Sequence, residues 1–175
     1  MTRRHPSHTL TTVNSTDNNI MRQDEFWMRK ALNLARLAGQ RDEVPVGALL
    51  VAQDGKTLLG KGLNRREEWR TPLGHAELIT LHRASQKLQA WRLLGSTLYV
   101  TLEPCLMCAG ALLQARVARV VYGAVDPKGG AAQSLYQVLQ DPRLNHRCDV
   151  SSGTLGAECG QMLTDYFRKK RALRK

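Results

Sequence analysis

Two short motifs in this chain of 175 residues contain side chains that commonly bind a metal ion. His75 and Glu77 lie two residues apart, and Cys105 and Cys108 follow about thirty residues later, directly after Pro104. One imidazole and two thiolates are ligands that zinc prefers, one fewer than the four that close a structural zinc site. The carboxylate of Glu77 is left over for proton transfer. The two motifs therefore predict a catalytic zinc centre.

The charge of the donor set explains why a base is needed beside the metal. Zn²⁺ with two thiolates and a neutral imidazole has no net charge, so it acidifies a water less than a zinc ion held by three imidazoles. The pattern H-x-E followed by P-C-x-x-C is typical of zinc enzymes that remove an amino group from a nucleobase. In that chemistry Glu77 would take a proton from the attacking water and return protons to the ring nitrogen and the leaving ammonia.

Two other roles for the cysteine motif stay open from spacing alone. The residues could form a structural zinc ribbon, or a redox C-x-x-C beside an unrelated histidine. Cys148, Cys159, His82 and His146 could supply a fourth ligand, but none forms a second paired motif. Glu103 could be a second acid, although ordering the nearby backbone is the role we favour.

The elements that must position these residues alternate between helix and strand. Asp24 is a candidate N-cap for the first helix, and Asp54-Gly55 is typical of a hairpin turn. The pattern predicts helices over about 24–39, 75–90, 105–115, 131–140 and 154–175, and strands over 46–52, 57–63, 97–101, 119–122 and 148–151. This order predicts an α/β fold, a three-layer α/β/α sandwich with a central mixed five-stranded sheet.

Length and composition indicate one domain, which we expect to span residues 23–175 after a disordered leader over residues 1–22. Translation could also start at Met21. No apolar run of about 18 residues or more suggests a membrane span, and the N-terminus lacks the apolar core of a signal peptide. Four cysteines are too few for a disulfide scaffold. We therefore expect a cytoplasmic protein without membrane contact.

The formal net charge of +11 favours a polyanionic partner. Six of the eight residues in the segment Arg168–Lys175 are basic, so the last helix is a candidate RNA contact, although it could be only a solvated helix end. Tyr166 and Phe167 precede this segment. They could stack on bases or pack the helix onto the body of the protein.

The motifs resemble those of bacterial tRNA-specific adenosine deaminases, in the cytidine deaminase-like superfamily, from about Glu25 to Arg171. The resemblance rests on the stretches Val44-Pro45-Val46-Gly47-Ala48, Asn64-Arg65, His75-Ala76-Glu77, Thr101-Leu102-Glu103-Pro104-Cys105-Leu106-Met107-Cys108-Ala109-Gly110, Gly123-Ala124-Val125-Asp126, Gly130-Ala131-Ala132 and Asn145-His146-Arg147.

The resemblance implies hydrolytic conversion of the wobble adenosine of a tRNA anticodon loop to inosine by a homodimer with one Zn²⁺ per subunit. It further assigns site residues. By the resemblance, His75, Cys105 and Cys108 would bind the metal, and Glu77 would shuttle protons. Asn64 would hydrogen-bond the base, and Asp126 would contact the anticodon backbone. The basic C-terminal helix, with Arg168 and Arg171, would bind phosphates.

The chain departs from the family at two places. Thr71-Pro72-Leu73-Gly74 stands where Asp-Pro-Thr-Ala is common, and Gly129 stands where Thr is common. We expect effects on loop structure and anticodon contact, not on the zinc ligands. Two other functions compete: deamination of a free base or nucleoside, such as guanine or cytosine, and RNA binding by a zinc-stabilised module without catalysis.

Overall fold

The central strands are apolar at nearly every position, so each must be covered on both faces. The computed structural model describes residues 15–173 and places these strands in a five-stranded sheet of order β2-β1-β3-β4-β5. The strands are β1 (Gly47–Val51), β2 (Leu58–Leu63), β3 (Thr97–Leu102), β4 (Arg119–Ala124) and β5 (Asp149–Ser152). The helices are α1 (Ser15–Gln40), α2 (Arg66–Trp69), α3 (Ala76–Leu88), α4 (Leu106–Gln114) and α5 (Gly156–Ala172), with a 3₁₀ turn, η1, at Val138–Gln140.

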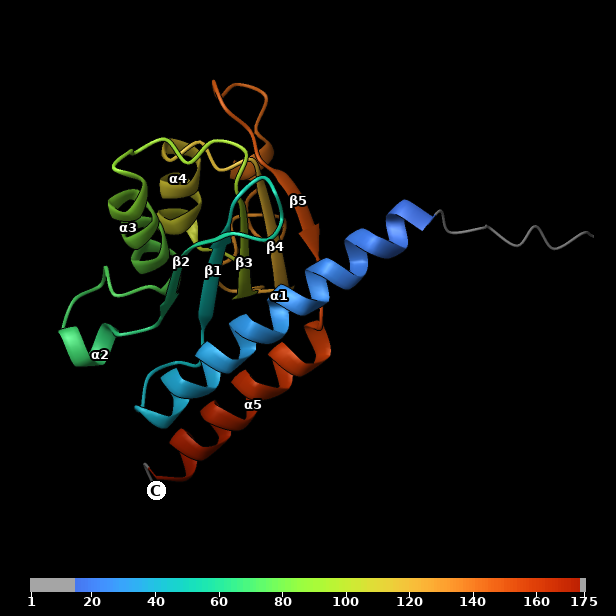
Figure 1. Ribbon diagram of the computed structural model, residues 1–175. Coiled ribbons are helices and arrows are strands. Elements are labelled where there is room, and N and C mark those ends of the chain that lie inside the picture. The colour runs from blue at the N-terminus through green and yellow to red at the C-terminus, as the bar shows by residue number, and fades with distance from the viewer. Residues whose placement is uncertain (1–14, 174–175) are drawn as a thin grey trace, which may run out of the picture.

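Alternate side chains along the strands enter two separate cores, as the pleat of a sheet requires. Leu50 and Leu98 belong to the core beneath α3 and α4. Leu49, Tyr99 and Val121 belong to the core beneath α1 and α5. Figure 1 shows these two pairs of helices on opposite faces of the sheet. The predicted three-layer arrangement and the mixed sheet are confirmed.

The pairing of the strands brings several chain segments to one edge of the sheet. β1 runs antiparallel to both β2 and β3, whereas β3, β4 and β5 are mutually parallel. The carboxyl ends of β2, β3 and β4 therefore lie at the same edge as the amino end of β1. There the Gly47 amide donates to Thr101 Oγ1 at 3.2 Å. The residues that follow Leu63, Leu102 and Ala124 all leave the sheet at this edge.

The first helix begins earlier than predicted, at Ser15 instead of after Asp24. Residues 15–22, expected to be disordered, are helical, and residues 1–14 of the predicted leader lie outside the described residues. Asp24 is buried in the helix interior, where its carboxylate accepts two hydrogen bonds from Arg119, at 2.6 and 2.8 Å, and one from the Tyr99 hydroxyl at 3.0 Å. A tertiary ion pair has replaced the expected helix cap.

The helix predicted over residues 131–140 was wrong, and only the short η1 turn forms there. The amides of Ala132, Gln133 and Ser134 donate to the carboxylate of Glu103 instead of to carbonyls four residues earlier. The short helix α2 was not predicted; it lies between the strand predicted over residues 57–63 and the helix predicted over residues 75–90. Among residues 15–173, no helix combines the length and apolar character needed to cross a membrane.

We expect Asp24→Ala to lower the free energy of unfolding by about 2–3 kcal/mol, because it leaves the half-buried Arg119 guanidinium without its partner. Urea unfolding followed by circular dichroism measures this change. Glu25→Ala is the matched control on the same helix, since Glu25 is exposed, and it should change stability by less than about 0.5 kcal/mol. Equal losses in the two variants would contradict a special role for the ion pair.

Candidate metal centre and active-site pocket

The three predicted metal ligands lie together at the start of two helices. His75 and Cys105 each have extended backbone, with ψ of 142° and 173°, and occupy the N-cap positions of α3 and α4. His75 Nδ1 lies 3.7 Å from Cys105 Sγ and 3.4 Å from Cys108 Sγ. The three ligand atoms all lie within 4.8 Å of one another, close enough to hold one metal ion.

Hydrogen bonds among the three ligand groups shift their pKa values in different directions, lowering that of Cys105 and raising those of His75 and Cys108. Hydrogen bonds from Cys108 and His75 lower the pKa of the Cys105 thiol to about 3, although burial opposes the shift. The hydrogen bond with Cys105 in turn raises the pKa of His75. The first cysteine is therefore a thiolate, the form that binds metal. Both helix N-termini add partial positive charge that stabilises such an anion.

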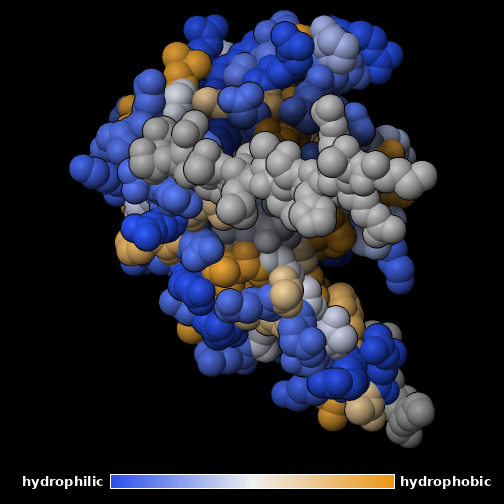
Figure 2. Space-filling model, turned by 90° about the vertical axis from the view of Figure 1, so that its right-hand side faces the viewer, coloured by the Kyte–Doolittle hydropathy of each residue, from blue (hydrophilic) through white to orange (hydrophobic). Residues whose placement is uncertain are grey.

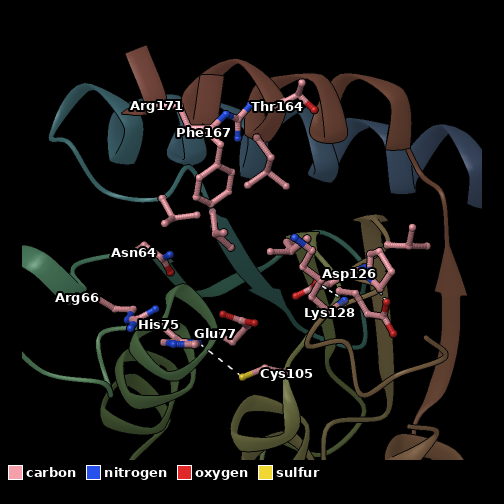
Figure 3. A pocket seen from close by; sticks show the side chains of 17 residues that line it. Asn64, Arg66, His75, Glu77, Cys105, Asp126, Lys128, Thr164, Phe167 and Arg171 are labelled. Carbon is pink, nitrogen blue, oxygen red and sulfur yellow. Dashed lines mark hydrogen bonds between the residues drawn. The ribbon is translucent and has the colours of Figure 1, made fainter. Parts of the chain in front are cut away.

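Glu77 lies in the first turn of α3, where its side chain is buried and reaches the same cavity. Burial raises the pKa of its carboxyl group, and the charges of His75 and Cys105 are close enough to affect that pKa. Figure 3 shows Glu77 between His75 and Cys105 on the floor of the cavity. A carboxyl group that can hold a proton thus stands beside the metal ligands.

The cavity has a volume of about 700 Å³ and opens between the metal cluster and α5. Its floor comes from the segments that leave the sheet at the edge described above. Phe167 and Arg171 of α5 form the opposite wall, and Phe167 points down toward Asn64 (Figure 3). Val44 and Val46, just before β1, also line the cavity. This combination of apolar surface and a few polar groups suits a flat heterocycle.

Asn64, predicted to contact a base, lies in the lining of this cavity and is buried. Its amide oxygen accepts a hydrogen bond from the Ala76 amide at 3.0 Å. This bond fixes the side chain at the start of α3, next to His75. The amide NH₂ group is left to donate into the cavity.

Asp126, the predicted backbone contact, also lines the cavity, at the turn after β4. Its carboxylate accepts hydrogen bonds from the amides of Lys128 at 3.0 Å and Gly129 at 3.1 Å. Its carbonyl accepts from Gly130 at 2.8 Å. Asp126 therefore shapes this turn as well as facing the cavity.

Glu103 orders the backbone of the loop beside the metal cluster, as favoured from the sequence. Its carboxylate is buried and accepts hydrogen bonds from the amides of Asp126, Ala132, Gln133 and Ser134, and from the Ser134 hydroxyl. Burial alone would raise the pKa of Glu103, but these hydrogen bonds outweigh it and lower the pKa. Glu103 is thus a charged anchor for the loop, not a proton donor.

The two predicted phosphate contacts on α5 differ. Arg171 lines the cavity, whereas Arg168 is not part of its lining and pairs with Asp165 at 2.5 Å. The sequence left open whether Phe167 packs or stacks; it is 44% exposed and faces the cavity. Lys128 and Arg66 line the cavity too and were not singled out. Only their positive charge near the motifs could have indicated them.

Comparison with known proteins places this site in a family. A family model for MafB19-like deaminases matches residues 22–171. A tRNA-specific adenosine deaminase from Bacillus subtilis is 46% identical over 159 residues, which cover 89% of this chain and 98% of the relative. Another, from Haemophilus influenzae, is 47% identical over 152 residues, 87% of each chain. The chain belongs to the family of tRNA-specific adenosine deaminases.

A solved structure supports the same assignment. It comes from work on A-to-I editing by tRNA:A34 deaminases at the wobble position of transfer RNA. It superposes with a TM-score of 0.74 at 44% identity, covering 78% of this chain and 98% of that one. The cytidine deaminase-like fold expected from the motifs is confirmed by this likeness to a tRNA adenosine deaminase.

The departure from the tRNA-specific adenosine deaminase pattern before His75 has a local structural reason. The Gly74 carbonyl accepts a hydrogen bond from the Arg65 amide at 2.8 Å, so the two backbone segments lie close together. A Cβ atom at Gly74 would stand 2.7 Å from the Arg65 carbonyl oxygen, closer than real Cβ atoms come. Glycine at this position lets the loop after Asn64 lie against the start of α3. Leu73, beside it, is exposed.

We expect Glu103→Ala to loosen the loop without removing any metal ligand. The substitution leaves the buried loop amides without an acceptor, which costs about 3 kcal/mol or more of stability. Hydrogen–deuterium exchange should become faster at residues 126–134, while the amides of β1 and β3 keep their protection. Glu158→Ala removes an exposed carboxylate and serves as the control. Unchanged exchange at residues 126–134 would contradict the anchoring role.

Proposed function

We propose that this protein hydrolyses adenosine to inosine at the wobble position of a tRNA anticodon loop. The observation that carries the proposal is the three-ligand cluster with the buried Glu77 beside it, at the floor of a cavity whose outer wall is a basic helix. The 46% identity to a tRNA-specific adenosine deaminase supports the choice of substrate.

The donor set fits Zn²⁺ better than other common ions. One imidazole nitrogen and two sulfurs suit the tetrahedral zinc coordination, and three protein ligands leave one position open. We propose one Zn²⁺ per subunit, held by His75, Cys105 and Cys108. When bound, the ion supplies a Lewis acid that makes a water more acidic.

Within this site Glu77 carries the protons. Its carboxylate takes one proton from the water that adds to C6 of adenine and delivers it to the adjacent ring nitrogen, N1. The second proton of the water then leaves with the amino group as ammonia, and inosine remains. Asn64, fixed by its bond to Ala76, donates its NH₂ group to the base and holds C6 over the metal cluster.

The wall opposite the metal cluster suits RNA. Arg66, Lys128 and Arg171 bring positive charge to the cavity rim, and Phe167 presents an exposed ring on which a base can stack. Asp126 would contact the backbone next to the extruded nucleotide. A free base fills only the floor of the cavity, so the charged wall favours a polynucleotide substrate.

We further propose that the protein acts as a homodimer in the cytoplasm. The dimer follows from the family resemblance, and exposed apolar side chains beside the site support it. Leu106 follows Cys105, and Leu135 and Tyr136 donate their backbone amides to the Gly130 carbonyl; all three side chains are about half exposed. Clustered exposed apolar groups commonly mark an interface between proteins.

The substrate class is tested by following inosine and ammonia release. An anticodon stem-loop RNA with adenosine at the wobble position should be converted, and the same RNA with guanosine there should not. Free adenosine, cytidine and guanine should react at least about 100-fold more slowly at equal concentration, because they lack the contacts to α5. Turnover of a free base or nucleoside alone would reject the tRNA proposal.

The catalytic role of Glu77 separates an enzyme from a binding module. Glu77→Ala should lower the deamination rate by at least about 1,000-fold while zinc content and RNA affinity stay near those of wild type. Cys108→Ser is the matched control, because it should lose the zinc measured by inductively coupled plasma mass spectrometry. A wild-type protein that binds zinc and RNA but makes no inosine would establish the binding module instead.

The two arginines of α5 should differ in RNA binding. Arg171→Ala should weaken binding of the stem-loop and lower the slope of log Kd against log salt by about 1, since it removes one phosphate contact at the cavity. Arg168→Ala should change the affinity and the salt slope less, because Arg168 is paired with Asp165 on the same helix. Fluorescence anisotropy from 50 to 200 mM salt measures both. If Arg171→Ala and Arg168→Ala had equal effects, the basic segment Arg168–Lys175 would bind RNA through its overall charge and not through a contact at the cavity.

A further inference from the structure

Helix α5 is attached to the body in two different ways along its length. Its first half is packed tightly, because Cys159 is buried against β4. A Cβ atom at Gly123 would lie 2.3 Å from Cys159 Sγ, so glycine there is what permits this close contact. Met162 and Leu163 pack against the same core. This half of the helix is held by apolar contact and by an exposed ion pair between Glu158 and Arg29.

The second half, from Thr164 onward, has no buried side chain. Among the described residues, the hydrogen bonds that join it to another element both end on Asp42, in the loop between α1 and β1. The Tyr166 hydroxyl donates to the Asp42 carbonyl at 2.9 Å, and the Lys170 ammonium donates to the Asp42 carboxylate at 2.5 Å. Figure 2 shows that the end of the molecule where α5 finishes projects from the body and is mainly hydrophilic.

The two residues held by Asp42 alternate with the two that face the cavity. Tyr166 and Lys170 are four residues apart and share one side of the helix. Phe167 and Arg171, each one position further on, lie about 100° around the helix and line the cavity. The contacts of Tyr166 and Lys170 with Asp42 therefore also fix the distance of Phe167 and Arg171 from the metal cluster.

Asp42 also lies close in the chain to residues that line another part of the cavity. Its backbone has φ of 64°, a left-handed conformation that ends the turn after α1. Two residues later the chain reaches Val44, which lines the cavity together with Val46. The loop is held in turn by Glu43, whose buried carboxylate accepts from the Glu68 amide at 2.8 Å. One short segment thus contacts the outer half of α5 and also contributes Val44 and Val46 to the cavity lining.

We propose that Asp42 is a positioning residue for the RNA substrate, which it serves by tethering Tyr166 and Lys170 and so setting the place of Phe167 and Arg171. This proposal rests on the proposed function and concerns binding of the anticodon loop, not the chemical step. Tethered, the outer half of α5 is ordered before RNA arrives. Without the contacts to Asp42, the outer half of α5 would become ordered only when RNA binds, and the entropy lost in that step would weaken RNA binding.

Charge alone makes the opposite prediction, which allows a sharp test. Asp42 is a negative group beside a basic RNA-binding helix, so neutralising it should strengthen RNA binding if only the overall field matters. Asp42→Asn removes this charge while tolerating the left-handed backbone. Tyr166→Phe removes only a hydroxyl group and leaves the charge unchanged. Glu158→Gln is the matched control, since it neutralises an exposed acid whose ion pair with Arg29, at 3.6 Å, lies on the half of α5 that Cys159 already packs against the body.

Steady-state deamination of the stem-loop RNA should show KM raised about two- to threefold in both Asp42→Asn and Tyr166→Phe, because each substitution weakens one of two exposed contacts, with kcat within about twofold of wild type. Glu158→Gln should leave KM unchanged or lower it. Hydrogen–deuterium exchange should become faster at residues 164–172 in the first two variants only.

A KM that is unchanged or lower in Asp42→Asn would overturn the tether while inosine formation by wild type kept the proposed function intact. If wild type made no inosine, the proposed function would fail on its own. The Kd of the stem-loop for wild type and Asp42→Asn, measured by anisotropy, would then decide the tether: weaker binding by the variant supports it, and equal or tighter binding rejects it.

Discussion

The structure of the site depends on the buried carboxylate of Glu103, which requires hydrogen-bond donors from the surrounding chain. Glu103 is almost fully buried, so its charged carboxylate needs hydrogen-bond donors from the protein, and backbone amides supply most of them. These amides lie in residues 126–134, and their approach forces that stretch out of helix and against the start of α4. There Gly130 pairs with Cys105 in an isolated β-bridge. The loop that Glu103 holds is therefore paired directly with the first cysteine ligand, Cys105.

The residues that could carry out the reaction and those that could contact RNA come from different layers of the fold. The metal ligands and Glu77 come from helices packed on one face of the sheet, at the edge where three strands end. The wall that faces them comes from α5 on the other face, and the cavity lies where the two layers meet at this edge. Changes in α5 can therefore alter which RNA is accepted while the donor set stays the same.

Patterns among residues close together in the sequence predicted much of the fold and of the metal site. The spacing of His75, Cys105 and Cys108 indicated a common site because two helix starts and one helical turn suffice to bring them together. The apolar runs indicated the strands for a similar reason. Asp24 was misjudged because its partner Arg119 lies 95 residues away, and local preference favoured a cap. The stretch 131–140 was misjudged because Glu103 takes the amides that a helix would use. Long-range partners decided both places.

The N-terminal part of α1 has a practical consequence for handling the protein. Residues 17–22 are exposed, and the next two side chains bond to the body: Gln23 donates to the Gly55 carbonyl at 2.9 Å, and Asp24 accepts from Arg119. Met21 lies about 30 Å along the helix axis from Gln40, and Val44, shortly after Gln40, lines the cavity. A shortened chain that started at Met21 would keep both cores and the ion pair. An affinity tag or fused partner joined there would stand well clear of an RNA bound at the opposite end of the helix.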